Sequence, residues 1–367
     1  MPFEIVTTDP NTQARAGMLH TEHGSVPTPA YMPVATKGAV KTISVNELEQ
    51  MGTNAIISNA LHLYLRPGEE NLRRVGGLHK FMRWEKTIFT DSGGFQIIRK
   101  KLNIKRSDDG LIFKDFFNGS TKHYTPELCM DVQKAIGSDV AMLLDDCPPF
   151  DANPQKVKEA LQQTLQWAKR GIKHGRAIGI PQIFAIVQGG TDATLRLHCT
   201  EELEKLNPDG YGIGGLSIGE PKEVMIQTLT ESNHILPPNK VRYLMGVGSA
   251  KEMLDAIELG VDFFDSTFPT QCARHGTIFT SLGRLNMKGL RLENDDRPLD
   301  ENCNCETCQK YSRSYINHLL REHEMLGMRL TSIHNLSYIL NLIRNARSSI
   351  LNGKFSEFKR SILSTLD

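Results

Sequence analysis

The chain has 367 residues, of which 39% are hydrophobic and 23% are charged, enough for one large hydrophobic core or two ordinary ones. No apolar run approaches the ~20 residues that a membrane-spanning helix needs, and the N-terminal residues lack the features of a secretory signal. We therefore expect a cytoplasmic protein with no membrane partner. The formal net charge of +1 provides no general attraction to nucleic acid, so any RNA contact must come from a local patch.

Short apolar runs that stop at a polar or glycine residue alternate with helical patterns along the chain. The runs end immediately before Asn59, Asp91, Asp145, Gln188, Gly246 and Asp265. Apolar residues at helical spacing fall between several of them, at 157–173, 221–232 and 250–259. Such bounded apolar runs are typical of parallel strands that are buried on both faces, and the alternation predicts repeated βα units.

The repeated βα pattern predicts an α/β fold, a (β/α)8 TIM barrel that spans residues 1–367 as a single domain. The carboxyl ends of all barrel strands open onto one face, which is where the polar residues are expected to gather. A doubly wound open sheet is the alternative. Against it, no G-x-G-x-x-G follows the first strand, and the candidate site residues are spread over about 200 residues.

Aspartates follow three of these strands. Asp265 is a candidate nucleophile, with a helix cap or loop carboxylate as the structural alternative, whereas Asp262 inside the same run is assigned a structural role. Asp91 precedes two glycines that let a flat ligand approach the backbone, and Asp145 and Asp146 add further carboxylates. Acids that converge on a barrel mouth suit acid–base chemistry, recognition of a nucleic base, or binding of a divalent metal.

Neutral and basic groups complete the candidate set. Gln188 with its two following glycines, and the glycine-rich segment 212–216, supply an amide and exposed backbone groups that can read the edge of a planar heterocycle. A local basic segment is the candidate for RNA contact, with a solvated charged loop as the alternative. It comprises Arg99, Lys100, Lys101, Lys105 and Arg106.

A cysteine cluster at Cys303, Cys305 and Cys308 predicts a zinc site. Three thiolates and one imidazole fill the tetrahedral shell of Zn²⁺, and a shell with no open position stabilises a fold without doing chemistry. We expect the metal to define a zinc-binding subdomain at about 285–345, inserted near the C-terminus. The histidines that could supply the fourth ligand are His318, His323 and His334.

Taken together, these segments resemble the tRNA-guanine transglycosylases, the queuine tRNA-ribosyltransferase family, and most closely its bacterial branch. The matching segments extend over nearly the whole chain. They are Asn59, HLYLRPG at 62–68, GGLHKFM at 76–82, TDSGGFQ at 90–96, VQGG at 187–190, GGLSIGEP at 214–221, YLMGVG at 243–248, FDS-x-x-PT from Phe264, and C-x-C-x-x-C with the later His334–Asn335 pair.

The resemblance implies an enzyme of queuosine biosynthesis that exchanges guanine at wobble position 34 of the tRNA anticodon loop for a 7-deazaguanine base. It implies a covalent ribosyl–RNA intermediate on Asp265, with Asp91 as general acid/base. It implies one structural zinc per chain, with His334 as the fourth ligand, and a Glu220 carboxylate that supports the backbone of 215–217. The residues it implies for base binding are Asp91, Ser92, Phe95, Asp145, Gln188, Gly215, Leu216 and Met245, and those for tRNA binding are Gln271 and Arg274.

The chain departs from the family pattern at Gln271, where bacterial members usually have an arginine whose charged fork an amide cannot supply. The resemblance also implies that Ile218 fills space where queuine-using relatives have glycine, so we expect a small 7-substituent, the aminomethyl of preQ1 or the nitrile of preQ0. The alternatives are a non-catalytic tRNA-binding partner subunit, an archaeosine-type enzyme acting at another tRNA position, and a metal-dependent barrel hydrolase. A homodimer is expected, although the sequence itself specifies no oligomeric state.

Overall fold

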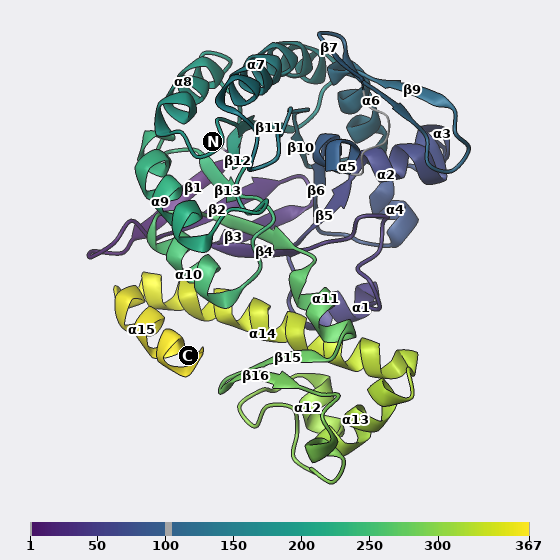
Figure 1. Cartoon of the computed structure of the whole chain (residues 1–367), viewed down its shortest axis with the longest axis vertical. Coiled ribbons are helices and arrows are strands. Elements are labelled where there is room, and N and C mark those ends of the chain that lie inside the picture. Colours follow the sequence, from purple (N-terminus) through teal and green to yellow (C-terminus); the bar gives the residue numbers. More distant parts are fainter. Residues whose placement is uncertain (1, 100–104, 367) are drawn as a thin grey trace.

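A parallel sheet of eight strands forms the centre of the protein. The computed structural model describes residues 2–99 and 105–366. The strand order is β4, β14, β13, β12, β11, β10, β6 and β5 (Figure 1). A parallel bridge between Val34 and Ile57 joins the two end strands, so the sheet closes on itself through this contact. The predicted (β/α)8 barrel is confirmed.

Six of the barrel strands coincide with the predicted apolar runs, and the other two, β4 and β12, were not predicted. The strands are β4 (Ala30–Pro33), β5 (Ala55–Asn59), β6 (Thr87–Asp91), β10 (Val140–Met142), β11 (Gln182–Val187), β12 (Gly210–Ile213), β13 (Val241–Leu244) and β14 (Phe263–Ser266). Aromatic side chains fill the barrel interior, where the ring of Phe89 lies 5.1 Å from that of Phe263 and 5.8 Å from that of Phe184. The interior is therefore a packed core, and it supports the barrel mouth, the end formed by the carboxyl ends of the strands.

Helices connect the strands and cover the outside of the barrel (Figure 1). The three predicted helices are present as α7 (Pro154–Ala177), α9 (Lys222–Ser232) and α10 (Ala250–Glu258). The side chain of Asn153 caps α7, which has a proline at its first position, as expected for a helix start. The others are α1 (Val45–Gln50), α2 (Ala60–Leu63), α3 (Glu69–Val75), α4 (Leu78–Met82), α5 (Gly94–Arg99), α6 (Pro126–Ile136), α8 (Ala193–Glu204), α11 (Phe268–Arg274), α12 (Glu306–Lys310), α13 (Arg313–Arg321), α14 (Met325–Leu351) and α15 (Phe355–Leu366).

Two small antiparallel sheets, neither of them predicted, are added to the barrel. The first, β1 (Phe3–Thr8), β2 (Arg15–Thr21) and β3 (Gly24–Thr28), packs apolar side chains into the barrel interior. The backbone carbonyl of His20 accepts a hydrogen bond from Gln182 at the first residue of β11, so this sheet closes the N-terminal end of the barrel. The second consists of β7 (Lys105–Ser107), β8 (Gly110–Lys114) and β9 (Thr121–Tyr124).

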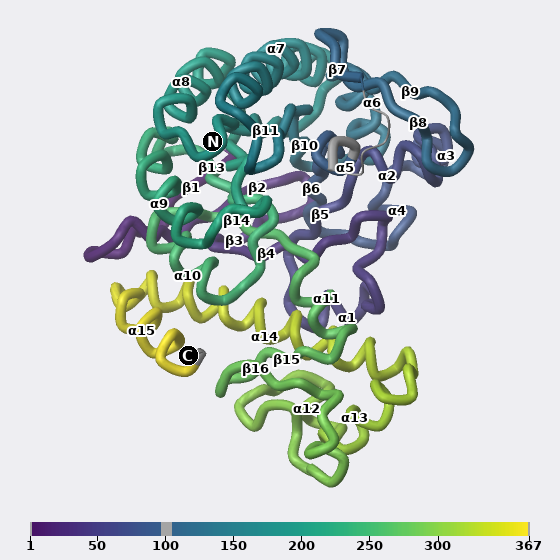
Figure 2. Tube along the Cα trace, viewed as in Figure 1, coloured from purple at the N-terminus to yellow at the C-terminus, as the bar shows by residue number. Residues whose placement is uncertain are grey.

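The C-terminal part forms a subdomain on the far side of α14 from the barrel (Figure 2). It contains the hairpin of β15 (Thr277–Thr280) and β16 (Gly283–Asn286) and a hydrophobic cluster of its own that extends from Ile278 to Leu330. The helix α14 packs against β4 on one side and against α12 and α13 on the other. The boundary at about 285–345 stays a prediction. None of the described helices is both long and apolar enough to cross a membrane.

Candidate active site

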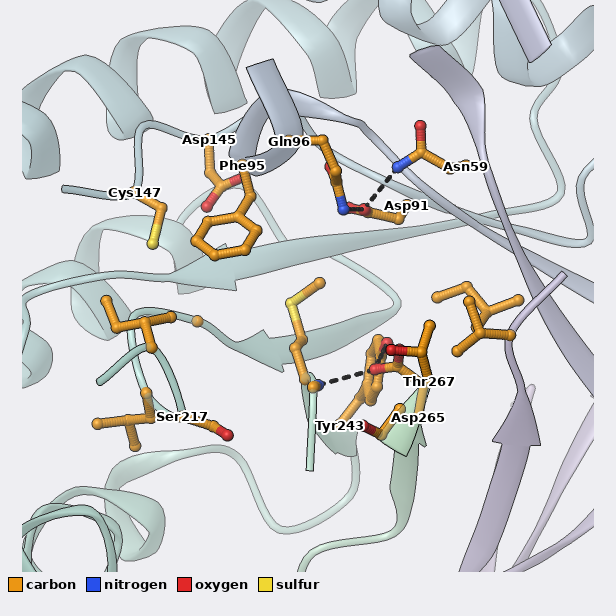
Figure 3. Close-up of a pocket in the computed structure, with 18 of the residues that line it drawn as sticks. Asn59, Asp91, Phe95, Gln96, Asp145, Cys147, Ser217, Tyr243, Asp265 and Thr267 are labelled. Carbon is orange, nitrogen blue, oxygen red and sulfur yellow. Dashed lines mark hydrogen bonds between the residues drawn. The ribbon is translucent and has the colours of Figure 1, made fainter. Parts of the chain in front are cut away.

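The carboxyl ends of the barrel strands surround a cavity of about 360 Å³ (Figure 3). Each polar residue that follows a predicted strand, apart from the buried Asp146, reaches this cavity or its rim. The predicted site residues that line it are Asp91, Phe95, Asp145, Gln188, Gly215, Leu216, Met245 and Asp265. Side chains that are up to 174 positions apart in the sequence, from Asp91 to Asp265, therefore line the same cavity.

Asp265, at the end of β14, is held through one of its two oxygens. Its Oδ1 accepts hydrogen bonds from the Tyr243 hydroxyl at 2.6 Å and from the Gly246 N–H at 2.9 Å. Among the described residues, no hydrogen bond is made to Oδ2. Burial raises the pKa of Asp265 to about 6, against the lowering effect of Tyr243 and Gly246. The carboxylate is thus fixed in orientation with one oxygen open to the cavity.

Asp91, at the end of β6, is oriented by two amide side chains. Its Oδ2 accepts hydrogen bonds from Asn59 Nδ2 at 3.0 Å and from Gln96 Nε2 at 2.8 Å (Figure 3). Burial raises the pKa of Asp91, because removal from water disfavours the charged form and these neutral donors compensate only in part. The group can therefore take up and release a proton more readily near neutral pH than an exposed aspartate.

Asp145 and Gln188 form a polar pair on another side of the cavity. The Gln188 Nε2 atom donates to Asp145 Oδ2 at 2.7 Å, while Gln188 Oε1 is buried with no partner among the described atoms. Burial, together with the negative charges of Asp91 and Asp146, raises the pKa of Asp145 to about 7, against the lowering effect of the hydrogen bond from Gln188. An acceptor without a partner and a carboxylate near its titration point suit a ligand that offers N–H groups.

A backbone segment after β12 forms the remaining wall. The Glu220 carboxylate accepts hydrogen bonds from the N–H groups of Ser217, Ile218 and Gly219, the last two at 3.0 and 3.2 Å. Ser217 has a positive φ of 59°, an unusual backbone conformation for a residue with a side chain. Glu220 thus supports this turn at Ser217 and beyond, whereas the prediction placed its support at 215–217.

Three predicted site residues lie away from the cavity lining. Ser92 is fully buried, and its carbonyl accepts a hydrogen bond from the Tyr124 hydroxyl at 2.9 Å. Gln271 and Arg274 lie on α11, the helix that follows the Asp265 strand, where Gln271 is exposed and Arg274 donates to the Thr270 carbonyl. Their contacts with RNA stay a prediction.

The predicted basic segment is only partly described. Lys100, Lys101 and the side chain of Arg99 lie outside the described part of the chain. Arg106 pairs with the buried Asp146, with 3.4 Å between Nε and Oδ1. One member of the segment therefore supports the barrel.

The three cysteines lie next to His334, the fourth ligand that the resemblance implied. Cys303, Cys305, Cys308 and His334 are all buried, and their ligand atoms lie within 4.8 Å of one another. The Nδ1 atom of His334 lies 3.2 Å from Cys308 Sγ, while its Nε2 lies 2.7 Å from the Phe279 carbonyl, which fixes the ring with Nδ1 facing the thiols. His318 and His323 are exposed and do not belong to the cluster. These four side chains can hold a metal ion.

Sequence reasoning did not assign roles to the residues that orient the acids. Tyr243, Asn59 and Gln96 stand in segments that carried the resemblance, but their function as hydrogen-bond donors depends on strands that are distant in the sequence. Cys147 also lines the cavity, and burial raises the pKa of its thiol to about 12, so it is held neutral. The signal that could have found Tyr243 was its place one strand away from the predicted nucleophile.

Buried acids and glycine-rich segments line the mouth of the barrel, and the cluster of three cysteines and one histidine lies apart from them. This arrangement is typical of a barrel enzyme. The profile of the family described as "Queuine tRNA-ribosyltransferase" matches residues 9–367. The queuine tRNA-ribosyltransferase of Listeria innocua is 46% identical over 97% of this chain and 94% of its own length. That of Dictyoglomus turgidum is 44% identical over 99% of this chain and 94% of its own length. The chain belongs to the queuine tRNA-ribosyltransferase family, and it is a pentosyltransferase.

Proposed function

We propose that this enzyme exchanges guanine at position 34 of the tRNA anticodon loop for a 7-deazaguanine base, by double displacement through a covalent intermediate on Asp265. The observation that carries this proposal is the grouping of Asp265, Asp91 and Asp145 around one cavity, each buried enough to have a raised pKa. None of the three forms an ion pair with a lysine or arginine among the described residues. Such acids are suited to nucleophilic and acid–base roles.

Asp265 acts as the nucleophile. Its Oδ2 attacks C1′ of the ribose, and the bond from Oδ2 to C1′ forms as the bond from C1′ to N9 of guanine breaks. The Tyr243 hydroxyl and the Gly246 N–H, both on Oδ1, keep the carboxylate aimed during this step. A second base then attacks C1′ from the opposite face and releases Asp265, so two inversions give net retention.

Asp91 transfers the proton. A departing guanine must gain a proton, and an incoming base must lose one from N9 before it attacks. The raised pKa of Asp91 allows it to be the acid in the first half of the exchange and the base in the second. The amides of Asn59 and Gln96 hold its Oδ2 in both states, because an amide N–H can donate to either form.

Asp145, Gln188 and Gly215 read the base. The edge of guanine or a 7-deazaguanine presents N–H donors at two positions and one carbonyl oxygen. Asp145 and the buried Gln188 Oε1 accept from such donors, and the Gly215 N–H can donate to the carbonyl. A protein reaches this edge only when the nucleotide is flipped out of the stack, as the single-stranded anticodon loop permits.

The wall at Ile218 supports a small 7-substituent. Ile218 is half-buried and lines the cavity beside Leu216 and Ser217. On the family resemblance, its branched side chain would fill space that the cyclopentenediol of queuine needs. We therefore favour preQ1 as the incoming base, with preQ0 next and queuine last.

A structural zinc, one per chain, is part of the proposal. The support is a buried shell of three thiols from the C-terminal subdomain and one imidazole from α14, away from the cavity that Asp265 lines. When bound there, the metal would stabilise the subdomain fold. Recognition of RNA by Gln271 and Arg274, a homodimer and a cytoplasmic location stay predictions.

Labelled guanine tests the reaction and the position together. We expect the enzyme to incorporate the label into an unmodified tRNA transcript with guanine at position 34, and none into the same transcript with adenine there. Incorporation into the adenine transcript would indicate another tRNA position, as in an archaeosine-type enzyme. Binding of both transcripts without any incorporation would support a non-catalytic partner subunit.

A further inference from the structure

Arg196 on α8 lies fully buried behind the wall of the base cavity. Its Nε donates to the Gly190 carbonyl and its Nη2 to the Gly214 carbonyl, each at 2.7 Å. Among the described residues it forms no ion pair with a carboxylate. Burying a charge without an opposite charge is costly, and burial lowers the pKa of Arg196 to about 10. A guanidinium kept in such a place indicates a specific role for the two carbonyls that it binds.

The contact with Gly214 fixes the direction of the next N–H. The peptide between Gly214 and Gly215 is planar and trans, so its C=O and N–H point in opposite directions. Because the Gly214 carbonyl faces Arg196, the Gly215 N–H faces away, toward the thiol of Cys147. Gly215 and Cys147 both line the cavity, and Figure 3 labels Cys147 there. A cation on the carbonyl also polarises the amide and strengthens its N–H as a donor.

The same helix holds the neighbouring loop. Gly190 belongs to the turn that follows Gln188, and the backbone N–H of Gln188 donates to Cys199 Sγ of α8 at 3.4 Å. Gly189 passes so close to the helix that an added Cβ would lie 2.8 Å from the backbone nitrogen of Arg196. One arginine therefore links the loop that carries Gln188 to the loop that carries the Gly215 N–H.

We propose that Arg196 is a positioning residue for base recognition. By bridging the carbonyls of Gly190 and Gly214, it aims the Gly215 N–H at the carbonyl oxygen of the purine-like base. The inference rests on the proposed function, because it assumes that the cavity receives such a base.

The test compares Arg196→Lys and Arg196→Met with matched variants of another buried arginine. Arg242 also donates to a backbone carbonyl, that of Leu236, at 2.8 Å, and burial likewise lowers its pKa to about 10. It stands near the N-terminal end of β13, at the end of the barrel opposite the cavity. Measured quantities are the KM for guanine, the KM for tRNA, kcat and the unfolding midpoint. We expect the guanine KM to rise about tenfold or more in Arg196→Met and less in Arg196→Lys, with the tRNA KM unchanged. The Arg242 variants should lose stability and keep the parental guanine KM.

A second measurement uses 2-aminopurine, which lacks both the carbonyl oxygen and the N1–H of guanine, as a competitor of guanine exchange. The parent enzyme should bind guanine more tightly, and Arg196→Lys should narrow that difference. Equal affinity of the parent for the two bases overturns the proposal whether or not the variants fold, and so does a parental guanine KM in a folded Arg196→Met enzyme. A parent that exchanges no guanine at all would overturn the proposed function first, and the role of Arg196 with it.

Discussion

Buried aspartates at the two ends of the barrel have opposite surroundings. At the N-terminal end, Asp262 accepts two hydrogen bonds from the Arg15 guanidinium at 2.8 and 2.5 Å, and Asp139 lies within 2.8 and 3.4 Å of two histidine rings. At the mouth, Asp265 and Asp145 have only hydroxyl, amide and backbone partners. Among the described residues, Asp262 therefore pairs with a guanidinium and Asp139 with two imidazole rings, whereas Asp265 and Asp145 have no basic partner.

The difference appears in the direction of the pKa shifts. Burial alone would raise the pKa of Asp139, but hydrogen bonds from His79, the Ile88 N–H and His23 bring it below its ordinary value. Burial raises the pKa of Asp145 to about 7 and that of Asp265 to about 6. Paired acids serve the fold, whereas unpaired acids weaken the fold and are available for chemistry.

The largest expected effect comes from Asp265→Asn. The amide cannot attack C1′, so exchange should fall at least about a thousandfold while tRNA affinity is unchanged. Because the folded pKa lies above the ordinary value, ionisation of the carboxyl group opposes folding increasingly above about pH 4 and fully above about pH 6. At pH 8 the variant should therefore be more stable than the parent, by on the order of 1–3 kcal/mol in urea unfolding. A variant that is inactive and also much less stable would break the comparison.

Cys305→Ser tests the cluster of three cysteines and one histidine, for which we propose a structural role like that of the paired acids at the N-terminal end. Metal content should fall from one zinc per chain, and the free energy of unfolding should fall by about 4 kcal/mol or more, since metal binding and folding are coupled. Metal analysis and denaturant unfolding measure both quantities. If the metal left with stability intact and only catalysis lost, the cluster would be catalytic, and a metal-dependent hydrolase would be favoured.

Asp262→Asn should have the opposite profile from Asp265→Asn. It leaves the buried Arg15 without its counter-charge, which is expected to destabilise the protein by about 3–5 kcal/mol. Turnover per folded molecule should stay within a few-fold of the parent, because the cavity is at the other end of the barrel. Measured side by side at pH 8, equal stability changes in the two variants would contradict the distinction between the ends.

The pH profile sharpens the comparison without a mutation. A carboxyl group with a raised folded pKa becomes protonated as the pH falls through that value, and protonated Asp265 cannot act as a nucleophile. The exchange rate should fall about tenfold per unit below about pH 6, with weaker base recognition beginning near pH 7 as Asp145 is protonated. Single-turnover rates from about pH 5 to pH 8 test this, and a flat profile would disagree.

The smallest effect is expected from Ile218→Gly, a change confined to the mouth. Removing the branched side chain relieves a clash worth about 1–3 kcal/mol, so queuine incorporation should rise roughly tenfold while stability changes little. Incorporation of preQ1, preQ0 and queuine into one transcript, by parent and variant, measures the shift. Efficient use of queuine by the parent would mean that Ile218 does not set the size limit.

The barrel and its acids could be predicted because buried parallel strands appear as apolar runs and site residues follow their ends. Strand β12 could not be predicted, because two glycines in its sequence GYGI are typical of a turn. Its glycines are explained only by packing against nearby strands, where a Cβ on Gly210 would lie 2.5 Å from the ring of Phe184 on β11 and one on Gly212 would lie 2.7 Å from Met142 on β10. Strand β4 contains a proline and is equally short.

Partners of the site residues were predicted least well. That Tyr243 donates to Asp265, or that Arg196 binds the Gly214 carbonyl, depends on elements brought together by barrel closure, and no local pattern encodes it. The predicted zinc ligands show the same limit, because the spacing left three histidines as possible fourth ligands. Only the resemblance selected His334, and the cluster geometry agrees with it.

The role of Asp265 is tested most directly by trapping its adduct. The parent enzyme is mixed with an unmodified tRNA transcript, denatured before the second base can react, and digested for mass analysis. We predict an RNA-linked peptide that contains Asp265, discharged when preQ1 is added before denaturation, and no adduct in Asp265→Asn. An adduct on Asp91, or one that persists in Asp265→Asn, would contradict the assignment of the nucleophile.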